Sequence, residues 1–182
     1  MEELIKKATD SVVASLKGVD NIYDTMFDIV KGNVVDLFNG AGDVVSAGTG
    51  AASKIVASLI KGIVEIGGEA EKAAEKVVMG TLKGANEAGK DAAGMIEDAV
   101  RGVIKGTNEV GGDVGKAAVG AVKGAIQAAG EIGVGTEDAL QKAVSGAIKS
   151  AGEIGESAVE TVKKALEDSV EGAKDVISST FK

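Results

Sequence analysis

The chain has 182 residues, including 27 glycines, three phenylalanines and one tyrosine, and it contains no proline, tryptophan, histidine or cysteine. Its 28 acidic and 20 basic residues give a formal net charge of -8, so no basic stripe is present that could bind a nucleic-acid backbone. Without histidine and cysteine it lacks imidazole general bases, thiol nucleophiles and the usual zinc ligands. We therefore expect no enzymatic activity, no small-molecule substrate, no cofactor and no metal.

Near-copies of one segment recur every 22 residues along the whole sequence. The marker of each copy is a Lys-Gly dipeptide or a variant of it, which stands at Lys17-Gly18, Asn39-Gly40, Lys61-Gly62, Lys83-Gly84, Lys105-Gly106, Gln127-Ala128, Lys149-Ser150 and Glu171-Gly172. No insertion or deletion separates the copies. A repeat of this regularity says more about architecture than about activity.

Each 22-residue unit divides into two elevens with apolar residues at the same positions. The two most regular columns hold valine and isoleucine and comprise Val56, Val78, Val100, Val122 and Val144, and Ile60, Ile104, Ile126 and Ile148. Within an eleven the apolar positions follow one another at spacings of three, one and three, which is a helical pattern and excludes a strand. Eleven residues in three turns correspond to about 3.67 residues per turn, which predicts a straight or slightly right-handed apolar stripe.

The constant phase of the repeat predicts an all-α fold made of one long, nearly continuous helix. Loops tolerate insertions, and units joined by loops are therefore expected to drift in length. The weakest places are residues 39–50 and 130–136, where several glycines coincide, so a bend or a hairpin turn there is the alternative. We treat residues 1–182 as a single repetitive helical domain.

Glycine is concentrated on the apolar side of this predicted helix. Each glycine in a helix interior costs about 1 kcal/mol relative to alanine, and a single helix or hairpin cannot cover a stripe this wide. We therefore expect other copies of the chain to complete the fold, since missing side chains let helix backbones approach closely. The predicted packing glycines are Gly18, Gly62, Gly84 and Gly106 in one column and Gly67, Gly89, Gly111, Gly133 and Gly155 in another.

Lysine and glutamate occupy the polar side at a spacing of four, in the pairs Lys61 and Glu65, Lys83 and Glu87, Lys105 and Glu109, and Lys149 and Glu153. Such pairs contribute a few tenths of a kcal/mol within a helix, and they can also pair with neighbouring helices. The aromatic residues Tyr23, Phe27 and Phe38 cluster in one stretch. We expect them to anchor a contact at one end of the assembly.

One stretch imitates a phosphate-binding loop. Residues 84–90 follow the Gly-x-x-x-x-Gly-Lys pattern, but Asp91 stands where a serine or threonine should contact magnesium, and no strand precedes it. The stretch is also one more copy of the repeat. We interpret it as part of the repeat.

The eleven-residue pattern with lysine and glutamate at fixed places resembles the late embryogenesis abundant, perilipin, apolipoprotein and synuclein groups. Helices rich in alanine and glycine that coat storage granules are similar in composition. The resemblance covers the whole chain as a pattern. It departs from the synuclein unit, whose order is Lys-x-x-Glu-Gly-Val, because here the order is Lys-Gly-x-x-Glu. The resemblance implies an amphipathic helix that becomes ordered on a surface or in an assembly, and no functional residue transfers.

Two functions follow as hypotheses. The first is a structural protein whose Gly/Ala/Val-rich helix faces pack side by side into a bundle, tube or filament, with other copies of the chain as partners. The second is an amphipathic coat on lipid droplets, granules or membranes, which is less favoured because the net charge opposes anionic lipid and aromatic anchors are scarce. We see no signal peptide and no transmembrane span. The compartment is unknown and is taken as the cytoplasm by default.

Overall fold

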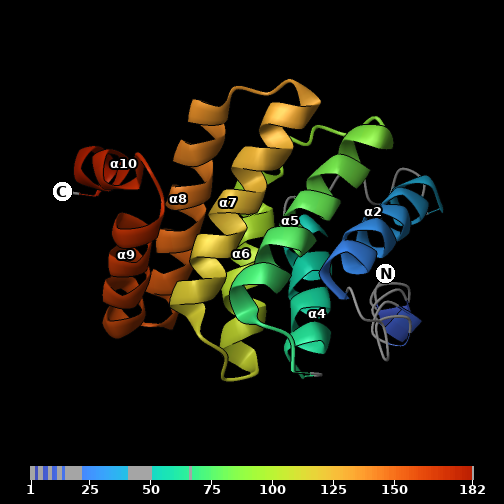
Figure 1. Ribbon diagram of the computed structural model, residues 1–182, viewed down its shortest axis with the longest axis horizontal. Coiled ribbons are helices and arrows are strands. Elements are labelled where there is room, and N and C mark those ends of the chain that lie inside the picture. Colours follow the sequence, from blue (N-terminus) through green and yellow to red (C-terminus); the bar gives the residue numbers. More distant parts are fainter. Residues whose placement is uncertain are drawn as a thin grey trace.

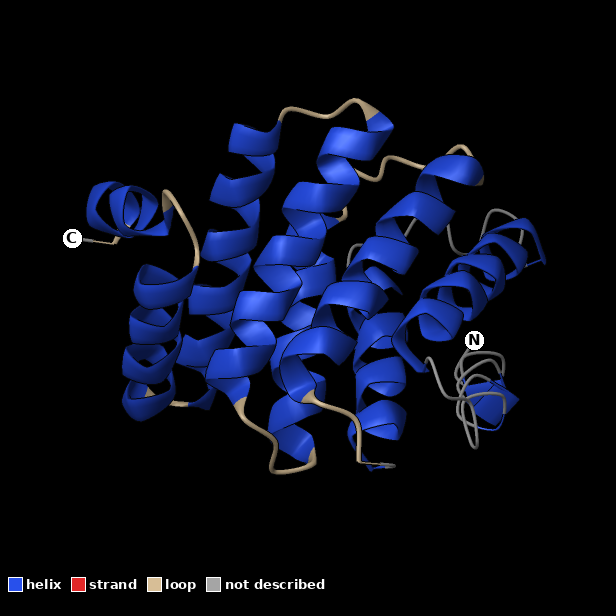
Figure 2. Ribbon diagram, in the orientation of Figure 1, coloured by secondary structure: helices blue, strands red, loops and turns tan. Residues whose placement is uncertain are grey.

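The structure is a computed structural model that describes residues 22–40, 51–65 and 67–181, together with Glu3, Lys6, Lys7, Asp10, Ser11 and Ala14. Every regular element in these residues is helical (Figure 2), which confirms the predicted all-helical character. The helices are α2 (Ile22–Gly40), α4 (Ala51–Glu65), α5 (Ala70–Glu87), α6 (Ile96–Glu109), α7 (Val114–Ile132), α8 (Thr136–Ile154), α9 (Glu156–Ser169) and α10 (Ala173–Thr180).

The prediction of one long, nearly continuous helix completed by other copies is wrong. The described helices are separate, between 8 and 19 residues long, and they pack against one another within a single chain. One 22-residue unit therefore corresponds to one helix with its turn, and a pair of units forms a helical repeat. The apolar columns are covered by neighbouring helices of the same chain.

The helices form two layers. In one layer α5 packs between α2 and α7, and α7 packs on α9; in the other α6 packs between α4 and α8, and α8 packs on α10. Figure 1 shows α2 at one end of the molecule and α9 with α10 at the other. Contacts therefore run between neighbours in the chain and between neighbours in a layer, as in helical-repeat proteins.

The turns are built on one glycine each, and these glycines are 22 residues apart. Gly67, Gly89, Gly111 and Gly133 have φ values of 90°, 69°, 68° and 79°, a region that glycine enters without steric cost. After each of them a backbone N–H donates to the carbonyl five residues earlier, for example from Val134 to Ala129 at 2.8 Å. This is the Schellman motif, a hydrogen-bonded helix end whose number of residues is fixed by its hydrogen bonds.

The next helix starts close behind the turn glycine. Asp113, two residues after Gly111, is the N-cap of α7 and its carboxylate accepts a hydrogen bond from the Lys116 N–H at 3.0 Å. Asp91 stands at the same place after Gly89 and accepts from the Gly94 N–H at 2.9 Å. Asp113 thus satisfies a free N–H group at the start of α7, whereas the bond of Asp91 lies in the turn before α6, whose N-cap is Met95. The phosphate-loop imitation at residues 84–91 is the end of α5 and the beginning of this turn.

Other glycines lie inside helices where two backbones meet. A Cβ added to Gly84 would lie 2.8 Å from the Lys31 carbonyl oxygen, and one added to Gly146 would lie 2.8 Å from that of Glu97. At Gly120 and Gly124 an added Cβ would overlap the carbonyl oxygens of Glu71 and Glu75. Each of these glycines therefore lets a helix pack directly on the backbone of its neighbour in the layer.

The core is made mostly of alanine, valine and isoleucine, and two threonines are enclosed in it. Thr81 and Thr107 are fully buried, and their hydroxyl groups have no hydrogen-bond partner among the described residues. A buried hydroxyl without a partner loses the hydrogen bonds that it made with water, which costs free energy of folding.

The predicted weak places can now be located. Residues 130–136 contain the turn between α7 and α8. Asn39 and Gly40 are the last residues of α2, and the remainder of the 39–50 stretch lies outside the described residues.

We predict opposite effects for two alanine substitutions in α7. Gly120→Ala should lower the free energy of unfolding by about 1–3 kcal/mol, because the methyl group overlaps the Glu71 backbone. Gly130→Ala should raise it by roughly 0.5–1 kcal/mol, because Gly130 is exposed and a Cβ there meets nothing closer than 3.6 Å. Urea unfolding followed by circular dichroism measures both. Equal effects of the two substitutions would contradict the close contact of α7 with α5.

Replacing a buried threonine should stabilise the protein. Thr81→Val keeps the shape of the side chain and removes the unpartnered hydroxyl, so we expect a gain of about 1 kcal/mol. Thr161→Val is the control, because the Thr161 hydroxyl is exposed and donates to the Ser157 carbonyl at 2.8 Å; no gain is expected there. Thermal unfolding of both variants checks the prediction, and a lower midpoint for Thr81→Val would show that the hydroxyl is bonded.

Candidate functional site

The predicted valine and isoleucine columns lie inside the stack. Val56, Val78, Val100, Val122, Val144, Ile60 and Ile104 are 0% exposed, and Ile148 is 4% exposed. Ile126 differs, because it is only half-buried and lies at the surface of α7. The columns thus face other helices of the same chain, and Ile126 marks a place where the covering is incomplete.

The predicted packing glycines divide into two groups. Gly62, Gly84 and Gly106 are buried within α4, α5 and α6, and a Cβ on Gly106 would lie 2.6 Å from the Ala57 carbonyl oxygen. The second column forms the turns, where an added Cβ meets nothing within 4 Å but φ is positive, and comprises Gly67, Gly89, Gly111, Gly133 and Gly155. Gly18 lies outside the described residues.

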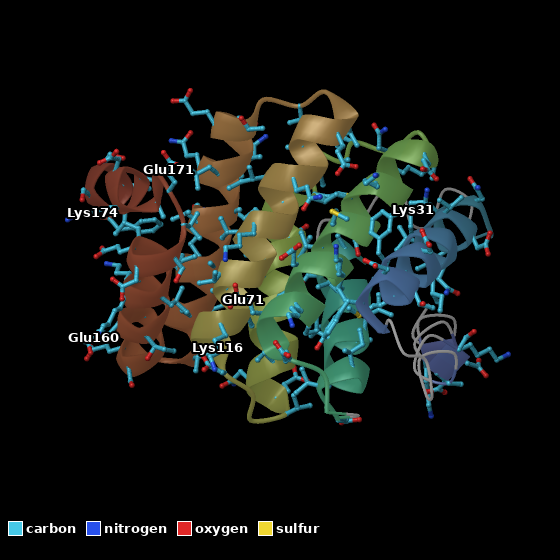
Figure 3. All side chains as sticks on the ribbon, viewed as in Figure 1. Lys31, Glu71, Lys116, Glu160, Glu171 and Lys174 are labelled. Carbon is cyan, nitrogen blue, oxygen red and sulfur yellow. The ribbon has the colours of Figure 1, made fainter. Side chains whose placement is uncertain are left out.

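Ion pairs connect α2 to α5, α4 to α6, α5 to α7 and α6 to α8. Lys61 pairs with Glu109, Lys83 with Glu131 and Lys105 with Glu153. Equivalent ion pairs therefore recur every 22 residues, and we call the set of inter-helix pairs the ion-pair ladder. Further ion pairs of the ladder join Lys31 to Glu87 at 2.8 Å, Lys123 to Glu71 at 2.9 Å and Lys149 to Glu97 at 2.9 Å. Figure 3 shows the charged side chains projecting from the outside of the stack. The described lysines of the predicted pairs therefore reach across to a neighbouring helix.

Two carboxylates of the ladder have shifted acidities. Hydrogen bonds from Lys105 and then Arg101 lower the pKa of Glu153. Hydrogen bonds from Lys83 and then Gln127 lower the pKa of Glu131. On the basic side, the hydrogen bond to Glu87 raises the pKa of Lys31. In each case the charged form is favoured in the folded protein. The free energy of unfolding therefore depends on the charge state of these side chains.

The aromatic residues make contacts at the α2 end. The Tyr23 hydroxyl accepts a hydrogen bond from the Glu69 N–H at 2.9 Å, and the Lys72 ammonium lies 5.4 Å from the ring centroid. The Lys83 ammonium lies 5.1 Å from the Phe27 centroid, and Phe38 is 2% exposed. These described contacts are intramolecular, and a contact with another copy at this end stays a prediction.

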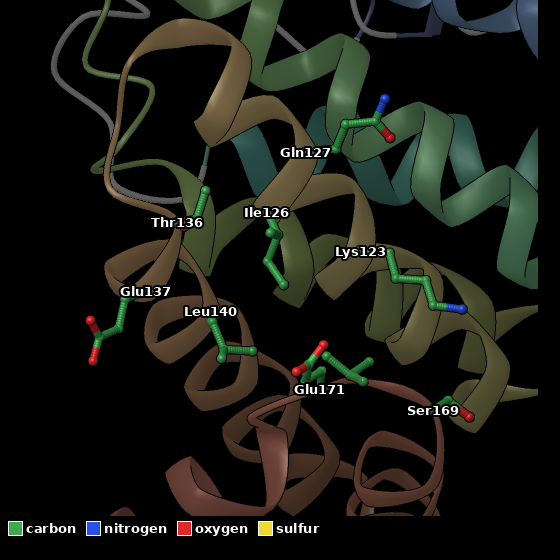
Figure 4. A pocket seen from close by; sticks show the side chains of 9 residues that line it. Lys123, Ile126, Gln127, Thr136, Glu137, Leu140, Ser169 and Glu171 are labelled. Atoms are coloured by element: carbon green, nitrogen blue, oxygen red, sulfur yellow. The ribbon is translucent and has the colours of Figure 1, made fainter.

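A groove of 510 Å³ opens where α7, α8 and the α9–α10 turn meet. Figure 4 shows Ile126 and Leu140 pointing into the same opening, with Glu171 on the turn facing them. The complete lining consists of Lys123, Ile126, Gln127, Thr136, Glu137, Leu140, Ser169, Val170 and Glu171. Its floor is apolar and its rim is polar. Of these residues only Ile126 was predicted as a packing residue, and Gln127 and Glu171 were noted only as markers of the repeat.

The groove exists because α9 ends early. Gly115, near the start of α7, lies next to Thr161 and Ala165 of α9. α9 ends at Ser169, soon after this contact, whereas α7 continues to Ile132. The second half of α7 therefore has no α9 partner. Gly172, with φ 79°, holds the turn that leads the chain away. Its equivalents in the repeat, Gly84 and Gly106, lie within helices, so the repeat pattern gave no signal of this break.

Comparison with the preceding repeat shows what the groove lacks. Leu82 and Ile96 stand 44 residues before Ile126 and Leu140, at equivalent positions of the repeat. Leu82 is 0% and Ile96 1% exposed, whereas Ile126 and Leu140 are only half-buried. Two residues that belong to the core of an internal repeat are thus partly open to solvent here.

In the part of the chain that the structure describes, no group of three or more acidic side chains could hold a metal ion. None of the described helices combines the length and apolar content that crossing a bilayer requires.

The ion-pair ladder predicts a loss of stability in acid. Because the pKa of Glu153 is lower in the folded state than in the unfolded state, its contribution is present above the unfolded pKa and is lost as the pH falls through the folded pKa. Below about pH 4.5 the melting temperature should drop. Glu153→Gln should flatten this dependence and lower the midpoint at neutral pH. The control Glu160→Gln removes a carboxylate with no ion pair among the described residues, and a similar flattening there would refute the assignment to Glu153.

Comparisons with known proteins support the fold and give no family. No protein-family description and no curated protein matches the sequence. The chain is similar in structure to a de novo designed helical repeat protein, DHR7, with a TM-score of 0.53 and 17% sequence identity over 98% of this chain and 96% of the other. This likeness shows the fold alone: the chain folds as a stack of helical repeats.

Proposed function

We propose that the protein is a structural scaffold that associates with further copies of itself at the open end of its helical stack. The observation that carries the proposal is the unfinished interface at α7, where α9 covers only the first half of the helix. In repeat stacks each unit contacts only its neighbours, so an unfinished face can accept one more helix without disturbing the others.

The rest of the stack has properties suited to a scaffold. Helices pack backbone to backbone through glycine, and ion pairs join neighbouring helices from α2 to α8 within each layer, as Lys83 and Glu131 do. Individual exposed pairs contribute little, but a network of them adds geometric definition. The described helices thus form a closely packed stack with charged outer faces.

Self-association is thereby assigned to the end of the stack, whereas the sequence predicted it along the helix faces. The Gly/Ala/Val faces, which were predicted to meet other copies, are buried against other helices of the same chain. Packing of these faces against another copy would require the helices of one chain to separate. A lipid coat has even less support, because Ile154, at 37%, is the single large hydrophobic side chain that is exposed among the described residues. An interfacial helix needs a broad apolar face.

The test is the mass of the purified protein as a function of concentration. We expect sedimentation equilibrium to show a monomer at low concentration and a growing mass at higher concentration, without lipid. A parallel flotation experiment with anionic and zwitterionic vesicles examines the coat. A monomer at every concentration would contradict the proposal, and flotation with vesicles by such a monomer would favour the lipid coat in its place.

A further inference from the structure

The groove at the end of the stack combines an apolar floor with a rim of unpaired negative charge. Ile126 and Leu140 belong to the floor, and both are half-buried. Glu137 and Glu171 line the same groove and are exposed. Neither carboxylate makes an ion pair with a described residue. An occupant must therefore cover aliphatic side chains and face two negative charges at once.

The lining itself offers no positive charge to balance these carboxylates. Lys123 is the one basic lining residue, and Glu71 of α5 holds it in an ion pair at 2.9 Å. Lys174, three residues beyond Glu171, lies outside the lining and makes no ion pair with a described residue. An occupant that brings positive charge to the rim gains electrostatic attraction in addition to apolar contact.

The described helices of a second copy do not supply this charge. From α2 to α10, only α9 has two lysines without an ion pair to a described residue, Lys163 and Lys164. The same helix has more carboxylates than lysines in this condition, namely Glu156, Glu160, Glu167 and Asp168. A second copy can thus cover the floor, but it leaves the rim carboxylates unpaired. A helix with net positive charge fits the groove better.

We propose that the groove binds a basic amphipathic helix of a partner protein, and that this partner thereby caps the stack against self-association. The inference rests on the proposed function, since the partner and a second copy compete for the same unfinished interface. Because α7 continues to Ile132 whereas α9 ends at Ser169, a helix beside the second half of α7 extends the layer. Helices within each layer already pack side by side, and a cap with a polar outer face is what the end of a repeat stack requires.

The positions of the charges define the docking face of the partner. Figure 4 shows Glu137 and Glu171 on opposite sides of Leu140. A helix matches this arrangement when leucine or isoleucine lies along the centre of its docking face and lysine or arginine lies on both flanks. The stems of the basic side chains cover the margins of the floor while their charged ends reach the carboxylates. The contact is of the helix-in-groove type.

The probe is a synthetic peptide of about four helical turns, with leucine along one face, lysine on both flanks and alanine elsewhere. Fluorescence anisotropy of the labelled peptide should show saturable binding to the full chain. Glu137→Gln/Glu171→Gln should weaken this binding at least roughly tenfold, because it removes both rim charges. The matched control Glu160→Gln/Glu167→Gln removes two unpaired carboxylates of α9 outside the groove and should change the affinity less than about twofold, since solvent and salt screen distant charges.

A second pair of variants tests the floor. Leu140→Ser should also weaken binding at least roughly tenfold, while Ile154→Ser, at an exposed hydrophobic residue outside the groove, should leave it unchanged. Circular dichroism verifies that each variant is folded. A peptide with glutamate in place of lysine should not bind. The inference is overturned if the lysine peptide does not bind, if all variants bind it equally, or if the glutamate peptide binds as tightly.

Sedimentation equilibrium separates this inference from the proposed function. An excess of the lysine peptide should convert the associating protein to the monomer, and Glu137→Gln/Glu171→Gln should require at least roughly tenfold more peptide. If the protein is monomeric at every concentration but binds the peptide in the groove, the proposed self-association fails and the assignment of the groove stands. If the protein associates and the peptide leaves its mass unchanged, the capping role is overturned and the proposed function survives.

Discussion

The close contact of helix backbones through glycine is the interaction on which the rest of the structure depends. Gly120 and Gly124 place α7 directly against the carbonyl groups of α5, and Gly102 and Gly106 do the same for α6 against α4. Contact at this distance lets short side chains fill the space between helices, so a core mostly of alanine, valine and isoleucine reaches full burial with Phe38 as the one aromatic side chain among its described buried residues. It also brings the ladder lysines within reach of glutamates on the adjacent helix.

The turns explain why a strictly periodic sequence folds into separate helices. The constant interval predicted an uninterrupted helix, on the argument that loops vary in length. Here the turn is a hydrogen-bonded Schellman motif at Gly67, Gly89, Gly111 and Gly133. An inserted residue would break the hydrogen bonds of the motif, so these turns keep a constant length. The signals were present in the sequence, since Gly111 is followed two residues later by the capping Asp113. Glycine ahead of an aspartate cap marks a helix end and a new start.

The candidate site could be predicted only in part, for a physical reason. Periodicity alone identified Ile126 as apolar, as it did Ile104 and Ile148, because all of them occupy one column. It could not show that Ile126 is half-buried, since burial depends on whether a neighbouring helix continues beside it. That depends on the length of α9 and on the conformation of Gly172, a glycine whose column equivalents Gly84 and Gly106 lie within helices.

This dependence has a consequence for where function can reside in such a chain. Internal units are nearly equivalent, and their side chains are covered or paired by neighbouring helices. Leu82 is buried, Glu71 forms an ion pair with Lys123, and Gly120 packs on the backbone of Glu71. A surface with all its groups satisfied has little free energy left to gain from a partner. Specific binding therefore requires a departure from the repeat, where core residues are uncovered and charges lack counterparts. Among the described residues these two conditions coincide at the groove bounded by Ile126, Leu140 and Glu171, which is why the proposed self-association is placed at the interruption of the period rather than on the regular units.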